Sequence, residues 1–416
     1  MRRPIAIDLF SGCGGMSLGL EAAGFDIAAS VELDPIHALV HHINFPYGAS
    51  ICQDINQLKT PKLIAKIKQK GFEAEVDLIA GGPPCQGFSH IGKRQLDDPR
   101  NSLVFEYVRI IKDIQPKYFI FENVPGIASG QHRQFLDELI SEFKRLGYVI
   151  AEPIKILDAS LFGAPQKRKR LILIGSRKDV TTAHYPLETH DEIEQNFNTV
   201  GDAISDLATI PALIGKDIGI DASKLDYSGF RKSFALMPSG AYHLCHKRQT
   251  DGRVWGHIGS QHTPESQMKF LSTEPGTVEK TSRFFKLSPS GLCNTLRAGT
   301  TSDKGAHTAP RPIHYLEPRC ITIREAARLH TFPDWFQFHR TIWHGFREIG
   351  NAVIPLLAKS LGAEIIQCLD IDVNRLEIGD LPEIDSQYLS YNMGMASNYW
   401  NVPYNGITKR KRLGKV

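Results

Sequence analysis

The stretch between Val76 and Cys85 limits the possible folds more than any other part of the chain. It begins as a short, mainly apolar run at 76–80, which is the pattern of a buried strand. Two glycines and two prolines at 81–84 then stop the strand, and Cys85 follows on the turn. Ligands bind beyond the carboxyl ends of parallel strands in open α/β sheets, so we expect a functional thiol there. The alternative, a small buried hydrophobe, fits less well because glycine, proline and glutamine flank the cysteine.

The composition is that of an ordinary globular protein, and 416 residues give length for two or more domains. Lys plus Arg number 49 against 45 acids, so the charge permits nucleic-acid binding without arguing for it. The seven cysteines include no C-x-x-C pair, which argues against a zinc ribbon or a disulfide framework and indicates a reducing compartment. No apolar run has the length of a signal-peptide core or a membrane span, so we expect a soluble, intracellular protein.

A glycine-rich turn follows the first expected strand. The apolar run 5–10 leads into the turn 11–15, and a helix is expected at 16–23. Glycines let the backbone approach a ligand, and the start of a helix offers free N–H groups. Ser17 occupies the third glycine position of the dinucleotide fingerprint G-x-G-x-x-G, so that fingerprint is absent. A purely structural turn is the alternative.

Acidic residues end the next two expected strands. Glu32 follows the strand 27–31, about 20 residues beyond the glycine turn, where a carboxylate suits ribose hydroxyls. Asp54 lies in the next unit and could accept a hydrogen bond from an adenine amino group. Together these acids suit a nucleoside without pyrophosphate, although either could be a solvated strand end.

Glu122 directly follows four apolar residues, 118–121, that read as a buried strand. We expect partial desolvation to raise the pKa of this carboxyl group and to favour a proton-donating form. A structural acid that caps the following turn is the alternative. Helices are expected on either side of this strand, at 102–114 and 135–146.

A basic run precedes the last expected strand of the first half, 171–174. It contains Gln166, Arg168 and Arg170, after a strand expected at 149–157. Alternation places the two arginines on one face of an extended chain. Such a run is most often a solvated face, but the functional interpretation is favoured here.

The interval from Lys178 to Glu317 has poor periodicity, with basic residues interleaved among aromatic ones. That mixture suits contacts to phosphates and base edges, or any small irregular domain. A cluster of His243, Cys245 and His246 lacks a partner pair at zinc spacing, so no metal site is expected.

Regular patterning returns after the interval. Thr322 and Glu325 form a capping box that opens a short helix. The run 349–355 is expected to open another helix that ends near Cys368. The tail from Asp370 is expected to be irregular, and its basic run 409–412 to be a frayed, solubilising end, with DNA contact as the alternative.

Gly-Pro-Pro-Cys-Gln-Gly-Phe-Ser at 82–89 resembles the nucleophile motif of the cytosine carbon-5 DNA methyltransferases, and Gln-x-Arg-x-Arg at 166–170 is similar to another family motif. Six motifs occur in family order between Ile5 and Cys368. The resemblance implies a doubly wound, mostly parallel, Rossmann-like α/β sheet with a smaller irregular recognition domain. The implied parts are a catalytic domain at 1–177, a target-recognition domain at 178–317, a return to the catalytic domain at 318–369, and a tail at 370–416.

The resemblance also implies roles for individual residues. Cys85 would add to carbon 6 of cytosine, Glu122 would hold and protonate N3, and Arg168 would position the base, with Gln166 and Arg170 completing the catalytic set. The segment 90–101 would close over bound DNA. The S-adenosylmethionine site would comprise Phe10, Gly12, Gly14, Gly15, Glu32, Leu33, Asp54, Ile55, Gly82, Pro84, Asn351 and Val353.

The expected reaction is methyl transfer from S-adenosylmethionine to carbon 5 of cytosine in duplex DNA, with S-adenosylhomocysteine as product and no metal. We expect a cytoplasmic monomer of a prokaryotic cell that does not bind membranes and is paired in function with a restriction endonuclease. A transfer-RNA cytosine methyltransferase and a non-catalytic DNA-binding module are the alternatives. A zinc deaminase is disfavoured because its H-x-E and C-x-x-C ligands are absent, and a dehydrogenase because the dinucleotide fingerprint is broken.

Overall fold

A computed structural model describes residues 3–73, 75–84, 102–130, 132–190, 196–225, 252–299, 311–373 and 385–403. Several residues of interest lie outside these ranges, namely Cys85, the segment 90–101, His243, Cys245, His246 and the basic run 409–412.

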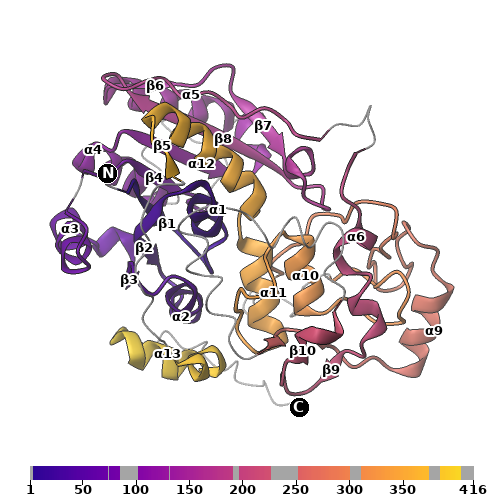
Figure 1. The fold of residues 1–416 in the computed structure, drawn as a ribbon. Helices are drawn as coiled ribbons and strands as arrows, with labels where there is room; N and C mark the ends of the chain where they lie inside the picture. Colours follow the sequence, from indigo (N-terminus) through magenta and orange to yellow (C-terminus); the bar gives the residue numbers. More distant parts are fainter. Residues whose placement is uncertain are drawn as a thin grey trace, which may run out of the picture.

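The described part of the chain is built on an eight-stranded sheet with the strand order β3-β2-β1-β4-β5-β8-β6, and β7 pairs with β8 (Figure 1). Five neighbouring strands are parallel: β3 (Ala49–Cys52), β2 (Asp26–Glu32), β1 (Ile5–Leu9), β4 (Leu78–Gly81) and β5 (Tyr118–Asn123). The strand order reverses its direction beside β1, as in other doubly wound sheets. The fold class expected from the sequence is therefore confirmed.

The antiparallel end of the sheet differs from the expectation in one place. β8 (Lys169–Arg177) runs antiparallel to β5 and pairs with both β6 (Tyr148–Ile150) and β7 (Lys155–Asp158). The single strand expected at 149–157 is therefore wrong. Pro153 lies in the gap and has no N–H to give to a ladder, so two short edge strands form instead of one.

Alternating side chains along the strands face two separate cores, as a sheet with a side-chain period of two requires. Ile7, Ile79 and Phe119 point to one core, which helices α3 (Thr60–Gln69), α4 (Ser102–Ile114) and α5 (His132–Arg145) cover. Ala6, Leu78 and Ile120 point to the other. That second face is covered by α1 (Gly15–Ala23), α2 (Pro35–Asn44) and α12 (Pro355–Leu369).

Helix α12 packs along α1, so late and early parts of the chain lie side by side. A Cβ atom at Gly19 would overlap the Cβ of Ala358 and the carbonyl oxygen of Pro355, so the two helices touch through their backbones. Gly362 makes a matching approach, since a Cβ there would lie 2.8 Å from the Cβ of Ala23. The two helices are far apart in the sequence, so this packing brings the late segment against the N-terminal part of the protein.

Two helices, not one, occupy the late segment. The run 349–355 opens α12 at Pro355, as expected, and its first residues also end α11 (Ile342–Asn351), a helix that was not expected. Proline at the first helical position explains this start, because its missing N–H would be unbonded there in any case. By length and composition, the stretch Ile342–Leu369 could cross a membrane, but half of it is buried within the protein.

The capping box before α10 (Ile323–Leu329) is confirmed. The Thr322 N–H donates to Glu325 Oε2 at 2.7 Å, and the Glu325 N–H donates to Thr322 Oγ1 at 3.1 Å. Both residues are fully buried, and Arg319 also donates to the Glu325 carboxylate at 2.8 Å. Burial raises the pKa of Glu325, but the hydrogen bond and the charge of Arg319 outweigh this effect, so the pKa is lowered to about 2.

The irregular part expected in the middle of the chain lies beside the sheet (Figure 1). The residues of this part that the structure describes form short elements only: α6 (Val200–Ile204), α9 (Pro264–Ser272), β9 (Leu213–Ile214), β10 (Ile220–Asp221), β11 (Arg253–Val254) and β12 (Ile258–Gly259). A small core of Leu207, Ile220, Leu225 and Val254 supports them. The residues that directly follow β8 still pack on the sheet, since the Tyr185 hydroxyl donates to the Ile172 carbonyl at 2.8 Å.

Part of the C-terminal tail is folded, so the expectation of an irregular tail from Asp370 is wrong for residues 385–403. Helix α13 (Met393–Trp400) packs Ala396 against Ile36 and Leu39 of α2. The Trp400 indole N–H donates to the Pro35 carbonyl at 3.0 Å. Aromatic residues at this end of the chain supply enough apolar surface to hold it on α2.

A buried polar chain crosses the core beneath the glycine turn. The Ser17 hydroxyl donates to Asp8 Oδ2 at 2.6 Å and lies 2.9 Å from His41 Nε2. Burial raises the pKa of Asp8 to about 7, although hydrogen bonds from Ser17 oppose this shift. Burial also lowers the pKa of His41 to about 3, so this imidazole is neutral at physiological pH.

The Gly19→Ala variant tests the backbone contact between α1 and α12. We expect it to lower the free energy of unfolding by about 1–3 kcal/mol, as overpacking of a well-filled interior does. Gly126→Ala is the matched control, because a Cβ at Gly126 would meet no atom within 4 Å. Denaturant unfolding of both variants measures the difference, and equal stability of the two would contradict the close helix contact.

The raised pKa of Asp8 makes a pH-dependent contribution to stability. The folded protein binds a proton on Asp8 more tightly than the unfolded chain does, so this contribution is complete below the ordinary pKa of 3.8 and is lost as the pH rises to about 7. Asp8→Asn cannot titrate. We therefore expect wild type to gain stability over the variant by about 1.4 kcal/mol per pH unit as the pH falls through this window. Unfolding curves of both proteins at pH 4.5, 6 and 7.5 test this, and a constant difference would refute it.

Candidate active site

Glu122 lies at the carboxyl ends of the neighbouring strands β4 and β5. β4 ends at Gly81, and Gly82 follows beside Glu122, the fifth residue of β5. A Cβ atom at Gly82 would lie 2.5 Å from Glu122 Oε2, so only glycine leaves room for this carboxylate. Pro84 is the last described residue of this segment, and Cys85 follows it in the sequence.

Arg170 faces Glu122 across the sheet. Its Nε lies 2.7 Å from Glu122 Oε1, and the two side chains are 14% and 12% exposed. The apolar strand expected to desolvate Glu122 is present, but a guanidinium group covers the carboxylate as well. The pair is therefore nearly closed to water.

Arg168 lies in a different environment, although only one residue separates it from Arg170. Its guanidinium group donates to the carbonyl oxygens of Leu296 at 2.8 Å, Gly350 at 2.8 Å and Ala352 at 3.0 Å. The side chain is 2% exposed, and burial and the nearby Arg170 lower its pKa to about 9. Both Nη atoms thus hold the backbone, whereas Nε has no hydrogen-bond partner among the described residues. The contact of Arg168 with the base stays a prediction.

Gln166 also holds backbone segments together. Its Oε1 accepts from the Leu296 N–H at 3.1 Å, and its Nε2 donates to the Leu329 carbonyl at 3.2 Å. The side chain is fully buried. Gln166 therefore joins the recognition part to α10, and the structure does not bring it to the catalytic edge.

Asn123 was missed by the sequence analysis. It follows Glu122 directly and donates through Nδ2 to the Pro83 carbonyl at 3.1 Å. This bond ties the end of β5 to the turn that leads to Cys85. Its position in the sequence, between a buried strand and a turn, was the available signal, since a buried amide there requires a partner.

The glycine turn after β1 adopts a conformation that side chains rarely tolerate. Gly12 and Gly14 have φ values of 54° and 106°, and even Phe10 has a φ of 60°. Strained backbone of this kind clusters at ligand sites. A Cβ atom at Gly15 would overlap the carbonyl oxygen of Val353, so the turn contacts the segment that carries Asn351 and Val353. The structure thus brings together these two widely separated sets of expected cofactor residues.

Glu32 is more than a solvated strand end. Its Oε2 accepts from the Gly12 N–H at 2.8 Å, and its Oε1 accepts from the N–H groups of Leu33 and Asp34, each at 2.8 Å. An ionised carboxylate offers about four lone-pair sites, so capacity for a further donor remains. Leu33 beside it is 62% exposed, which leaves an apolar surface open next to the acid.

Asp54 and Ile55 stand at the end of the next strand. Asp54 Oδ1 accepts from the Asn56 N–H at 2.9 Å and caps a short 3-10 turn, η1 (Ile55–Gln57). The Ile55 side chain is 4% exposed and packs in the core, so only its backbone faces the edge. The Gln53 N–H donates to the Glu32 carbonyl at 3.0 Å, which keeps the two acidic strand ends adjacent.

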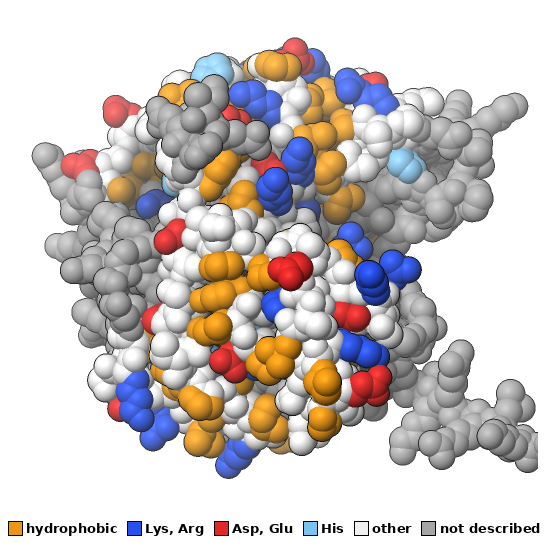
Figure 2. Space-filling view, turned by 90° about the vertical axis from the view of Figure 1, so that its right-hand side faces the viewer, with side chains coloured by type: hydrophobic (Ala, Val, Ile, Leu, Met, Phe, Trp, Pro, Cys, Tyr) orange, Lys and Arg blue, Asp and Glu red, His pale blue; other side chains and the backbone are white. Residues whose placement is uncertain are grey.

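The face of the recognition part carries basic and apolar side chains side by side (Figure 2). Hydrophobic residues are well exposed there, among them Met268 at 71% and Leu271 at 59% of α9. Within the described residues, no group of three or more histidine, cysteine or acidic side chains is placed to hold a metal ion.

Comparison with known proteins agrees with this geometry. The sequence model of the family described as C-5 cytosine-specific DNA methylase matches residues 5–367. Type II methyltransferase M.XorII of Xanthomonas oryzae pv. oryzae is 47% identical over 375 residues, which are 89% of this chain and 86% of that protein. Type II methyltransferase M1.HphI of Haemophilus parahaemolyticus is 34% identical, over 87% of this chain and 86% of its own.

Solved structures share the fold. A protein described as a DNA modification methyltransferase encoded within an E. coli prophage superposes with a TM-score of 0.70 and 32% identity, over 88% of this chain and all of that one. S. pombe Dnmt2 methyltransferase has a TM-score of 0.59 at 17% identity, over 89% of this chain and all of that one, and bears on the fold alone. The chain therefore belongs to the C-5 cytosine-specific DNA methylases and is a DNA cytosine methyltransferase.

Proposed function

We propose that the protein transfers a methyl group from S-adenosylmethionine to carbon 5 of cytosine within a specific duplex DNA sequence, as the modification enzyme of a restriction-modification system. One observation carries the proposal. The ends of four adjacent parallel strands, β2, β1, β4 and β5, present in order Glu32, the glycine turn, the turn to Cys85, and Glu122. Cofactor residues and catalytic residues thus share one sheet edge, as transfer between two bound molecules requires.

The chemistry demands a nucleophile and an acid at this edge. Carbon 5 of cytosine is weakly nucleophilic and lies inside the stack, so the base must be flipped out of the duplex. The Cys85 thiolate would add to carbon 6, while Glu122 holds N3 and gives it a proton, which makes carbon 5 enamine-like. Carbon 5 then takes the methyl group. Loss of the carbon-5 proton to solvent, return of the N3 proton to Glu122 and departure of the Cys85 thiolate from carbon 6 then restore the aromatic ring.

Arg170 is assigned the role first expected of Arg168. It is the guanidinium group that touches Glu122, so it holds this carboxylate in place and lies next to the base that Glu122 binds. Arg168 and Gln166 are positioning residues, because their donors and acceptors hold backbone segments. Asn123 supports the turn to Cys85.

The residues at the cofactor end fit S-adenosylmethionine, which supplies an electrophilic methyl group when bound. Glu32 has acceptor capacity for ribose hydroxyls, and Asp54 would accept a hydrogen bond from the adenine amino group. The exposed Leu33 offers a surface for the base. Phe10, Gly12, Gly14, Gly15, Ile55, Gly82, Pro84, Asn351 and Val353 complete the proposed set, and no metal is needed.

The partner assignments follow from the names of the relatives and from the fold. Type II methyltransferases among the relatives favour duplex DNA over transfer RNA as substrate, and pairing in function with a restriction endonuclease. The interval 178–317 would read the DNA sequence through base contacts. A cytoplasmic monomer remains our prediction.

Cys85→Ser tests the nucleophile. We expect it to abolish methylation and to leave S-adenosylmethionine binding nearly intact, since the change removes only the thiolate. DNA that contains 5-fluorocytosine should form a covalent complex with wild type, because fluorine at carbon 5 cannot leave as a proton does. Denaturing gel electrophoresis detects this complex. Turnover by the serine variant at the rate of wild type would rule out Cys85 as nucleophile.

Methionine substitutions at the two arginines separate their roles. Arg168→Met should lower the free energy of unfolding by about 3 kcal/mol or more, because three buried carbonyls lose their donors. Arg170→Met should lower kcat by roughly a hundredfold in the folded enzyme, and it should also lower stability, because the nearly buried Glu122 carboxylate loses its partner. Thermal unfolding and steady-state methylation assays measure both effects. The reverse pattern would return the base contact to Arg168.

A further inference from the structure

Arg109 of α4 donates hydrogen bonds to the connection between β3 and α3, which carries Asp54. Its Nη2 donates to the Leu58 carbonyl at 2.9 Å and lies 3.5 Å from the Ile55 carbonyl oxygen. Its Nη1 donates to the Thr60 hydroxyl at 2.9 Å. The two carbonyl groups belong to the connection between β3 and α3, and Thr60 is the first residue of α3. One guanidinium group on α4 therefore reaches from the η1 turn to the start of α3.

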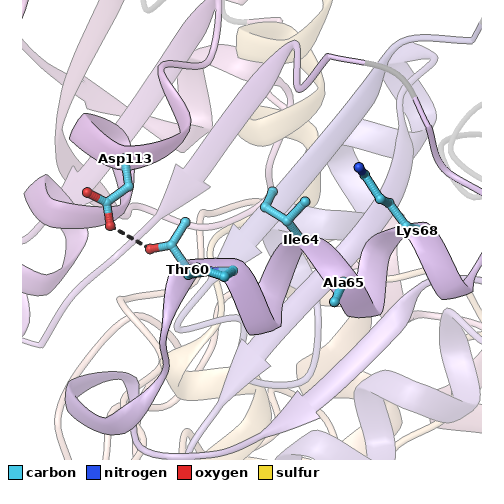
Figure 3. Close-up of a pocket in the computed structure, with 6 residues that line it drawn as sticks. Thr60, Ile64, Ala65, Lys68 and Asp113 are labelled. Atoms are coloured by element: carbon cyan, nitrogen blue, oxygen red, sulfur yellow. Dashed lines mark hydrogen bonds between the residues drawn. The ribbon is translucent and has the colours of Figure 1, made fainter.

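Two acids hold the guanidinium group from its own helix. Arg109 Nε donates to Glu106 at 2.7 Å, and Nη1 lies 3.3 Å from Asp113 Oδ2. The Thr60 hydroxyl donates to the same Asp113 oxygen at 2.6 Å (Figure 3). Figure 3 places this contact at one end of a surface groove between α3 and α4. The planar group is thus fixed on both sides and is not a freely moving surface arginine.

The stretch needs this support because its side chains and its carbonyl groups face opposite ways. Ile55 and Leu58 are 4% and 1% exposed and pack in the core with Tyr107 of α4. Their carbonyl oxygens point away from the core, toward Arg109. Side-chain packing alone fixes where the stretch lies, whereas the guanidinium group also fixes the orientation of its peptide units.

We propose that Arg109 is a positioning residue for the adenine end of the cofactor site. The inference rests on the proposed function, in which Asp54 accepts from the adenine amino group. Asp54 Oδ1 caps the η1 turn through the Asn56 N–H, so the direction of the carboxylate depends on that turn. Arg109 holds the carbonyl of the first turn residue and that of Leu58 just beyond the turn. Without Arg109, cofactor binding would have to order the turn, and that free-energy cost would weaken the affinity for the cofactor.

The planar fork is essential to this role. Arginine presents five donors in a fixed geometry, and here they meet two carbonyls, one hydroxyl and two carboxylates. A lysine ammonium is a point charge with three donors and cannot span the same set. Arg109→Lys should therefore restore part of the effect that Arg109→Met removes.

The test compares Arg109→Met and Arg109→Lys with Arg145→Met in the full-length protein. Arg145 of α5 is the matched control, because it pairs with Glu142 three residues earlier just as Arg109 pairs with Glu106, and its side chain is 67% exposed. Calorimetry without DNA gives the Kd for S-adenosylmethionine. Methylation assays give kcat and the separate KM values for cofactor and DNA, and thermal unfolding reports stability.

We expect Arg109→Met to raise the Kd and the KM for S-adenosylmethionine roughly tenfold, which is about 1.4 kcal/mol. Its kcat at saturating cofactor and its KM for DNA should stay within about twofold of wild type. The Kd and the KM of Arg109→Lys for S-adenosylmethionine should fall between those of wild type and Arg109→Met. Those of Arg145→Met should match wild type. If Arg109→Met fails to fold, the Kd of Arg109→Lys decides.

Two results would overturn the inference. A lower melting temperature with an unchanged Kd for the cofactor would make Arg109 a structural residue only. Equal changes in the KM for cofactor and in the KM for DNA would show that the effect of Arg109 is not confined to the cofactor site. Failure of this inference can be told apart from failure of the proposed function. If the wild-type protein binds S-adenosylmethionine but methylates no cytosine, the proposed function is wrong. The effect of Arg109 on the Kd for the cofactor can still be measured in that case.

Discussion

A single buried guanidinium group, that of Arg168, joins the separate segments that form the catalytic edge. It reaches Leu296 in the recognition part and Gly350 and Ala352 in the connection between α11 and α12. Burying a cation is costly unless hydrogen bonds replace its water, and three carbonyl dipoles do so here. The pKa of about 9 lies above neutral pH, so the group keeps its charge and continues to attract those carbonyls.

This arrangement explains how a long interval can stand between two halves of one catalytic body. Arg168 and Gln166 hold the end of the interval from one side, and Arg328 of α10 holds its beginning through Asp206 at 2.7 Å. The backbone contact of α1 with α12 then seats the returning segment against the glycine turn. The interval can therefore vary in its own structure while both of its ends stay fixed at the sheet.

Most of the sheet was predictable because a buried strand has a recognisable sequence pattern, a short apolar run bounded by turn residues. The strands β1, β4 and β5 are apolar runs whose ends are marked by glycine or by an acidic residue. The capping box of α10 can be recognised from four consecutive residues. Contacts across the chain left no such signal. Arg109 binds carbonyl oxygens about fifty residues earlier, and a carbonyl is present at every position, so nothing in the sequence distinguishes its partners. Pro153, which separates β6 from β7, is a signal that the sequence does contain, because proline interrupts the hydrogen bonding of a strand.

Arg168 and Arg170 show the limit of reading a site from spacing. Alternation fixes the face from which a side chain starts, but the acceptors within reach decide where it ends. Arg168 meets three fixed carbonyls and cannot leave them without exposing a buried cation. Arg170 meets one carboxylate and the carbonyl of Lys169, and both remain partly open at the sheet edge. A group that acts on a substrate must be able to share its partners when the substrate arrives, and in this pair only Arg170 can do so.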